Sequence, residues 1–67
     1  MPIVEVTLVN GRSPEELRAM ISAVTTAVSE TVAAPVESIR VIVREVPTTL
    51  FAAGDVTIAE RRAGQRT

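Results

Sequence analysis

The chain has 67 residues and a formal net charge of −1, and it contains no His, Cys, Lys, Tyr or Trp. A domain of this length buries only about 60% of its unfolded surface, so its stability alone is marginal. Without Cys it forms no disulfide, and without Cys and His it lacks the usual zinc ligands. Oligomerisation is the remaining way to stabilise so small a domain, and we therefore expect an oligomer.

Composition also restricts the partners. Nucleic-acid binding requires clustered cations or aromatic stacking platforms, whereas Phe51 is the single aromatic residue here. No run approaches the roughly 20 apolar residues of a membrane span, and the first residues lack the basic and apolar regions of a signal peptide. We expect a cytoplasmic protein that binds neither nucleic acid nor membranes.

The first strand and the start of a helix are read directly from the sequence. Residues 2–9 are rich in β-branched and apolar types and predict a strand, with Pro2 tolerated at its first position. Ser13 is the predicted N-cap of a helix and Pro14 its first residue, while Glu16 completes a capping box.

The helix is predicted to cover residues 14–33. Pro35 disfavours the helical conformation at the residue before it, which predicts the end of the helix. Apolar residues at helical spacing fall within an arc of roughly 120° and predict one buried face. They are Leu17, Met20, Ile21, Val24, Val28 and Val32.

Residues 39–46 predict a second strand. Its alternation places Ile39, Val41 and Val43 on one face and Arg40, Ile42 and Arg44 on the other. A strand, a helix and a strand form a βαβ unit, so the two strands are expected to be parallel, with a right-handed crossover. The predicted fold is α/β (α+β), in a single domain that spans residues 1–67.

The last third of the chain contains turn residues and a polar end. Residues 47–58 predict a loop and a short hairpin able to clasp a neighbouring subunit, and residues 59–67 predict a polar tail. The helix covers one face of a two-stranded sheet, which leaves the other face and both edges without partners. Topology therefore indicates an oligomer, as composition does.

Absent residue types exclude most familiar catalytic sites. Ser-His and Cys-His dyads, Schiff-base lysines and phenol acids cannot form, and no Gly-rich phosphate loop is present. We therefore expect no cofactor and no metal. Carboxylates, arginines, hydroxyls and the amino terminus remain as candidates for chemistry.

Pro2 is the candidate for proton transfer. If Met1 is removed, the terminus is the secondary amine of Pro2, and a free α-amino group titrates at about 7.7 to 8.0. Neighbouring cations and an apolar setting would lower this pKa and make the amine a general base. Arg12, Arg40 and Phe51 are suitable neighbours in kind.

Each of these residues alone also has a structural explanation. Pro2 can simply open a strand, and Arg12 can be a solvated turn residue. Arg40 can be a cross-strand ion-pair partner, and Phe51 can anchor an interface. Their joint occurrence on a βαβ chain favours the functional interpretation.

An ordered set of motifs runs from Pro2 to about Arg62, namely Pro2, Asn10-Gly11-Arg12-Ser13, Ala34-Pro35, Ser38-Ile39-Arg40-Val41, and Phe51 shortly before Gly54. In these motifs the chain resembles the short subunits of the tautomerase superfamily, specifically the 4-oxalocrotonate tautomerase group. Singly these motifs are weak, but their order over a chain of this length is specific.

The resemblance implies a cofactor-independent isomerase with a catalytic amino-terminal proline, here Pro2. Arg12 would bind a substrate carboxylate. Arg40, from an adjacent subunit, would bind the 2-oxo and carboxylate end and stabilise charge on oxygen, and Phe51 would supply apolar wall. The implied assembly is a hexamer built as a trimer of dimers, and a homo-oligomer is our expectation for it.

Asp55 departs from the family, in which many relatives have Gly-Gly where this chain has Gly54-Asp55. The change alters the hairpin or brings a carboxylate to the pocket mouth, and it leaves the substrate open. Related dehalogenases and hydratases have an acidic residue where this chain reads Phe51-Ala52-Ala53, so hydration chemistry is disfavoured.

Three hypotheses follow from the sequence. The first is an isomerase (tautomerase) that ketonises a 2-hydroxymuconate-type dienol acid through Pro2. The second is a specialised biosynthetic relative that acts on a different enol or keto substrate. The third is a non-catalytic subunit of a mixed oligomer.

Overall fold

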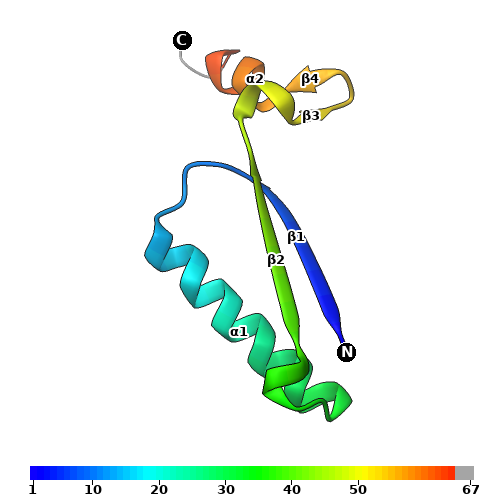
Figure 1. The fold of residues 1–67 in the computed structure, drawn as a ribbon. Coiled ribbons are helices and arrows are strands. Elements are labelled where there is room, and N and C mark those ends of the chain that lie inside the picture. Colours follow the sequence, from blue (N-terminus) through cyan, green and yellow to red (C-terminus); the bar gives the residue numbers. More distant parts are fainter. Residues whose placement is uncertain (65–67) are drawn as a thin grey trace.

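The computed structural model describes residues 1–64 (Figure 1). In chain order the elements are β1 (Ile3–Val9), α1 (Pro14–Val32), the 3₁₀ turn η1 (Val36–Ser38), β2 (Arg40–Val46), the 3₁₀ turn η2 (Thr48–Leu50), β3 (Ala52–Ala53), β4 (Val56–Thr57) and α2 (Ile58–Gly64). Strands β1 and β2 pair in parallel, with Ile3 opposite Arg40 and Val9 opposite Val46. The predicted βαβ unit is confirmed, and β3 and β4 form a short antiparallel hairpin.

The start of α1 follows the predicted capping box. The amide of Glu16 donates to Ser13 Oγ at 3.1 Å, and the amide of Ser13 donates to Glu16 Oε1 at 2.9 Å. The bond from the Ser13 amide, followed by that from its side chain, lowers the pKa of Glu16 below the ordinary value of 4.5. At the other end Ala33 is the C-cap in a left-handed conformation, φ 56°, so the helix stops one residue before the predicted position.

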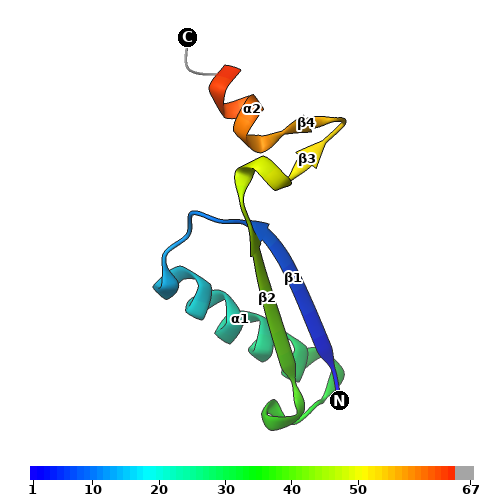
Figure 2. The same cartoon turned by 45° about the horizontal axis from the view of Figure 1, so that its top comes forward.

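Helix α1 covers one face of the two-stranded sheet (Figures 1 and 2). Most of its predicted apolar face is half-buried, but Val32 is 61% exposed because it lies at the last turn of α1. Val41 and Val43 are half-buried on the covered face of β2, and Ile39, just before β2, is the only core side chain classed as buried among residues 1–64. The core of one chain is therefore small.

The other face of the sheet is open. It presents Ile3 and Ile42, which are 58% and 42% exposed, together with Glu5, Arg40 and Arg44. Arg44 Nη2 and Glu5 Oε1 form an ion pair across this face at 2.7 Å. Exposed pairs of this kind contribute only about 0 to 1 kcal/mol, so the pair does not replace a covering layer.

Residues 47–64, from Pro47 through η2, the β3–β4 hairpin and α2, form what we call the C-terminal arm. The arm projects beyond the carboxyl end of β2, away from the βαβ unit (Figures 1 and 2). The chain measures 49 × 24 × 16 Å, with a radius of gyration of 15.6 Å. A compact domain of this length would have about 11 Å. One chain is thus not a closed globule.

The arm corrects the prediction of a polar tail over 59–67. Residues 58–64 form α2 because a second capping box starts this helix: the amide of Glu60 donates to Thr57 Oγ1 at 3.0 Å, and the amide of Thr57 donates to Glu60 Oε1 at 2.8 Å. Ile58, expected in the hairpin, is the first residue of α2. The rest of the predicted tail, residues 65–67, lies outside the described residues.

Within residues 1–64, neither α1 nor α2 has the length and apolar character needed to cross a membrane.

Candidate active site

Pro2 and Arg40 lie together at the amino-terminal end of the sheet. The amide of Arg40 donates to the carbonyl oxygen of Pro2 at 2.9 Å, so their backbones are adjacent. Strand alternation places Pro2 on the covered side with Val4, whereas Arg40 pairs with Ile3 on the open side. Pro2 is half-buried, while Met1 before it is 78% exposed.

A 3₁₀ turn holds the guanidinium group of Arg40. Arg40 Nη1 donates to the carbonyl oxygen of Glu37 at 3.0 Å. That carbonyl belongs to η1, in which the hydroxyl and amide of Ser38 both donate to the carbonyl oxygen of Pro35, at 2.8 and 3.0 Å. Arg40 is therefore fixed by its backbone to Pro2 and by its side chain to η1.

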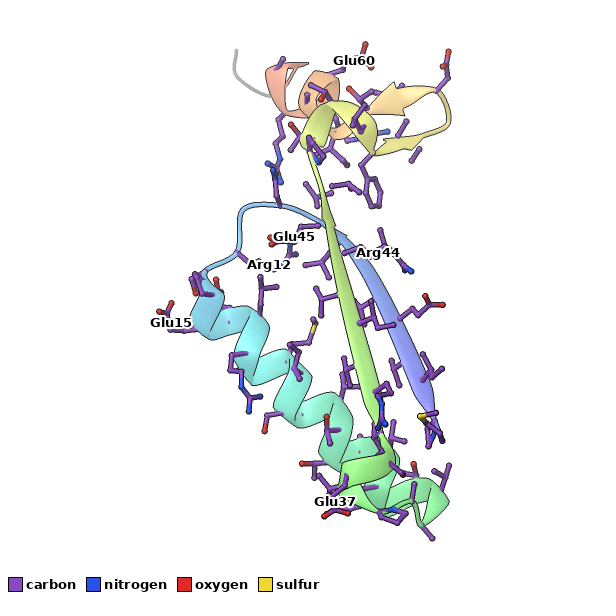
Figure 3. All side chains as sticks on the ribbon, viewed as in Figure 1. Arg12, Glu15, Glu37, Arg44, Glu45 and Glu60 are labelled. Carbon is purple, nitrogen blue, oxygen red and sulfur yellow. The ribbon has the colours of Figure 1, made fainter. Side chains whose placement is uncertain are left out.

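Arg12 lies at the opposite end of β1, beside the start of α1. Figure 3 shows it at the far end of the βαβ unit from Glu37. Its Nη1 donates to the carbonyl oxygen of Val9 at 2.9 Å, and its side chain is exposed. At a rise of about 3.3 Å per residue, the strand between them separates Pro2 from Arg12 by more than about 20 Å.

Phe51 belongs to the C-terminal arm. It is the half-buried C-cap of η2, and its carbonyl oxygen accepts the amide of Ile58 at 2.9 Å. The structure thus brings Pro2 and Arg40 to one end of the chain and leaves Arg12 and Phe51 toward the other. A single chain does not gather the four predicted residues around one substrate.

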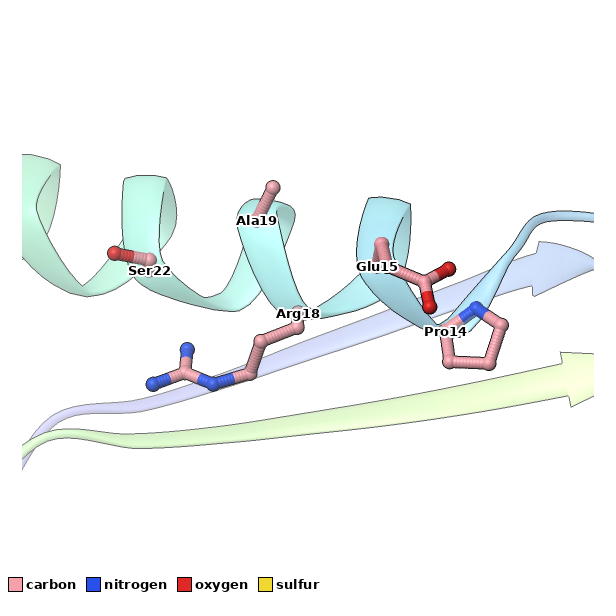
Figure 4. A pocket seen from close by; sticks show the side chains of 5 residues that line it. All are labelled: Pro14, Glu15, Arg18, Ala19 and Ser22. Carbon is pink, nitrogen blue, oxygen red and sulfur yellow. The ribbon is translucent and has the colours of Figure 1, made fainter.

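A surface pocket lies elsewhere, along the outer side of α1 (Figure 4). It is lined by Pro14, Glu15, Arg18, Ala19 and Ser22. These residues are exposed, and none of the four candidates lines it. The lining contains neither an imidazole nor a free amine, so we do not assign the proton-transfer chemistry to this pocket.

The sequence analysis did not predict two local elements, the helix α2 and the 3₁₀ turn η1. The spacing Thr57-x-x-Glu60 is a capping box and is the signal that predicts α2. The spacing Pro35-x-x-Ser38 is the signal for the turn that presents a carbonyl to Arg40.

The family model described as Tautomerase enzyme matches residues 2–61. The chain belongs to the tautomerase family. This tautomerase is 40% identical over 63 residues to a probable tautomerase from Lactiplantibacillus plantarum, covering 94% of this chain and 98% of that protein. It is 39% identical over 54 residues to a 2-hydroxymuconate tautomerase from Stutzerimonas stutzeri, covering 81% and 86% of the two chains.

Solved structures place this tautomerase in the 4-oxalocrotonate tautomerase family. TomN, a 4-oxalocrotonate tautomerase homologue in the tomaymycin biosynthetic pathway, is 48% identical, with a TM-score of 0.91 over 92% of this chain and 95% of the other. A heterohexamer 4-oxalocrotonate tautomerase from Chloroflexus aurantiacus is 30% identical, with a TM-score of 0.87 over 90% and 97%. The predicted tautomerase-like βαβ fold with a hairpin is confirmed.

Proposed function

We propose that this tautomerase ketonises a 2-hydroxymuconate-type dienol acid, with the amine of Pro2 as general base and then general acid. Membership of the tautomerase family supports an isomerase-type enzyme. The observation that carries the proline mechanism is the position of Pro2, directly after an exposed Met1, in a chain without His, Cys, Lys or Tyr. Once Met1 is removed, Pro2 holds the one amine with an ordinary pKa near neutrality.

The amine can take a proton only in its neutral form. An apolar setting and neighbouring cations both lower the pKa of an amine, because they disfavour its charged form. The half-buried position of Pro2 supplies part of such a setting. Arg40 and Phe51 would complete it in the assembled protein.

Arg12 and Arg40 are assigned to the substrate. The planar guanidinium fork matches a carboxylate, and a cation beside the 2-oxygen stabilises the negative charge that develops when a proton leaves carbon. Both side chains are exposed and able to meet a ligand. No cofactor takes part in this scheme, since proton transfer needs only an acid and a base.

We propose that the site is composite. Two chains packed antiparallel about a two-fold axis would place the Pro2 end of one chain beside the Arg12 end of the other. Arg40 lies on the open face, turned away from its own Pro2 ring, which supports its contribution to the site of an adjacent subunit. A homohexamer built as a trimer of dimers would also cover the open face. The cytoplasmic location stays a prediction.

A second candidate is a biosynthetic tautomerase with a different enol or keto substrate. The identity to TomN is 48%, against 39% to the 2-hydroxymuconate tautomerase from Stutzerimonas stutzeri. Poor turnover of 2-hydroxymuconate with Pro2, Arg12 and Arg40 intact would favour this candidate. A catalytically silent chain that gains activity with a second kind of subunit would instead indicate a mixed oligomer.

The decisive experiment combines intact mass with kinetics. We expect the protein to lack Met1 and to ketonise 2-hydroxymuconate in a spectrophotometric assay. Pro2→Ala should lower kcat by about 10², because the secondary amine held by the proline ring is replaced by the freely rotating primary amine of alanine, which is a poorly positioned base. Arg12→Ala should raise KM. Arg40→Ala should lower kcat as well, since charge stabilisation is lost with it.

The matched control is Ser22→Ala, on the exposed outer side of α1, which should leave both constants unchanged. Full activity in Pro2→Ala would refute the requirement for the secondary amine of proline. A retained Met1 in an active preparation would refute it too, because Pro2 nitrogen is then a tertiary amide without basicity.

A further inference from the structure

Arg40 is held before any substrate arrives. Its amide donates to Pro2 and its Nη1 donates to the carbonyl oxygen of Glu37. Arginine has much rotamer freedom, and ordering such a side chain during binding weakens affinity. A guanidinium group that is already ordered by a hydrogen bond avoids part of this entropy cost.

The Glu37 carbonyl is in turn placed by η1. Ser38 closes this turn with two hydrogen bonds to the carbonyl oxygen of Pro35, one from its hydroxyl at 2.8 Å and one from its amide at 3.0 Å. The amide of Ile39 adds a bond to the carbonyl oxygen of Val36 at 3.2 Å. Glu37 lies inside the closed turn, at the end of the βαβ unit seen in Figure 3.

Arg12, Arg40 and Arg44 differ in the group to which each guanidinium donates. Arg12 and Arg40 each donate to a neutral backbone carbonyl three residues earlier, which orients the guanidinium group without neutralising it. Arg44 on the same open face is paired with the carboxylate of Glu5 at 2.7 Å, which competes with any acidic ligand. The remaining N–H donors of Arg40 stay available for a substrate carboxylate.

We propose that Ser38 is a positioning residue for Arg40. Its hydroxyl closes the turn that presents the Glu37 carbonyl, and this carbonyl pre-orients the guanidinium group for a substrate carboxylate. The proposal rests on the proposed function in one respect, namely that Arg40 binds the carboxylate of the substrate. It adds a residue whose side chain acts without touching the substrate.

The test measures carboxylate binding apart from catalysis. Muconate, the dicarboxylate without the 2-hydroxyl group, is titrated into the assembled full-length protein by calorimetry. Ser38→Ala should weaken binding about three- to tenfold, because Arg40 must then be ordered on binding. Ser38→Thr keeps a hydroxyl and should bind as the parent does, and Ser22→Ala serves as the surface control. Thermal melting and sedimentation check that each variant stays assembled.

A double-mutant cycle distinguishes positioning from a general structural effect. In an Arg40→Ala background Ser38→Ala should cause no further loss, because the group that it positions is absent. Equal losses in both backgrounds would overturn the proposal. In addition, ¹⁵N relaxation of Arg40 Nε without ligand should report an ordered side chain in the parent and a more mobile one in Ser38→Ala.

The outcomes separate the two proposals. If the parent binds muconate and Ser38→Ala binds it equally well, only the positioning role fails. If the assembled parent does not bind muconate at all, the proposed substrate class fails, and the role of Ser38 in binding falls with it. An Arg40 Nε that is equally ordered in both proteins would overturn the role of the turn, whatever the substrate.

Discussion

At the scale of single residues, Gly54 and Asp55 take the two central positions of the hairpin turn. Their φ angles are 59° and 68°, both in the left-handed region, and Ala53 pairs with Val56 on either side of them. Two such residues make a type I′ turn, which glycine, asparagine and aspartate accept most readily. Asp55 therefore has a backbone role that is independent of any substrate.

Substitutions at this turn test whether the backbone conformation of Gly54, and not side-chain packing, contributes to stability. Gly54→Ala should destabilise the assembled protein by about 1 to 2 kcal/mol per chain, because alanine is strained at this φ. Nothing lies within 4 Å of a Cβ added there, so a clash would not explain the loss. Asp55→Gly should be neutral or slightly stabilising. Chemical denaturation followed by circular dichroism measures both, and a Gly54→Ala protein as stable as the parent would contradict this account.

At the scale of elements, the two helices share one device at their amino ends. The Ser13–Glu16 pair starts α1, and the Thr57–Glu60 pair starts α2. Hydrogen bonds from the Thr57 amide first, and its hydroxyl second, lower the pKa of Glu60 below 4.5, as those from Ser13 do for Glu16. A carboxyl group whose pKa is lowered by folding stabilises the fold only while it is ionised.

This linkage predicts an acid-sensitive arm. The contribution of Glu60 should be complete above pH 4.5 and should be lost as the pH falls through the lowered pKa of the folded state. NMR chemical shifts of α2, followed from about pH 7 to about pH 2, should therefore report fraying at acid pH. Glu60→Gln should remove this dependence in α2 and retain it at the start of α1. If α2 frayed over the same pH range in Glu60→Gln as in the parent, Glu60 would not be the cause of its acid sensitivity.

The elements were largely predictable from the sequence, since their signals are local. The capping box at Ser13, the alternation of residues 40–44 and the βαβ order all depend on neighbours a few positions away. Val32 was wrongly predicted to be buried, because helical periodicity does not show where along its length a helix stops contacting the sheet. Helix α2 was missed because the polar character of residues 59–64 outweighed a capping signal at Thr57.

At the scale of the whole molecule, the extended shape sets what one chain can do. Its radius of gyration of 15.6 Å exceeds the compact value of about 11 Å, and Leu50 in the arm is 75% exposed. Pro2 and Arg12 lie at opposite ends of β1. If they serve one reaction, they belong to different chains.

Subunit mixing tests this directly. Assayed at substrate concentrations well below KM, Pro2→Ala and Arg12→Ala chains are each expected to be strongly impaired alone and to regain activity when refolded together in equal amounts. A site then takes an intact Pro2 and an intact Arg12 with a chance of one half each, so about a quarter of parental activity is expected. Activity that stays at the level of the separate variants would show that one chain supplies both residues.

The sequence by itself determined the βαβ order, the helix start and the identity of the candidate residues, because these depend on residue type and short spacing. Only the tertiary structure decided their arrangement: Arg40 beside the backbone of Pro2, Arg12 and Phe51 far from both, and Ser38 in the turn that seats Arg40. The physical reason is that strand pairing fixes which ends meet. Local spacing alone carries no such information about residues that are distant along the chain.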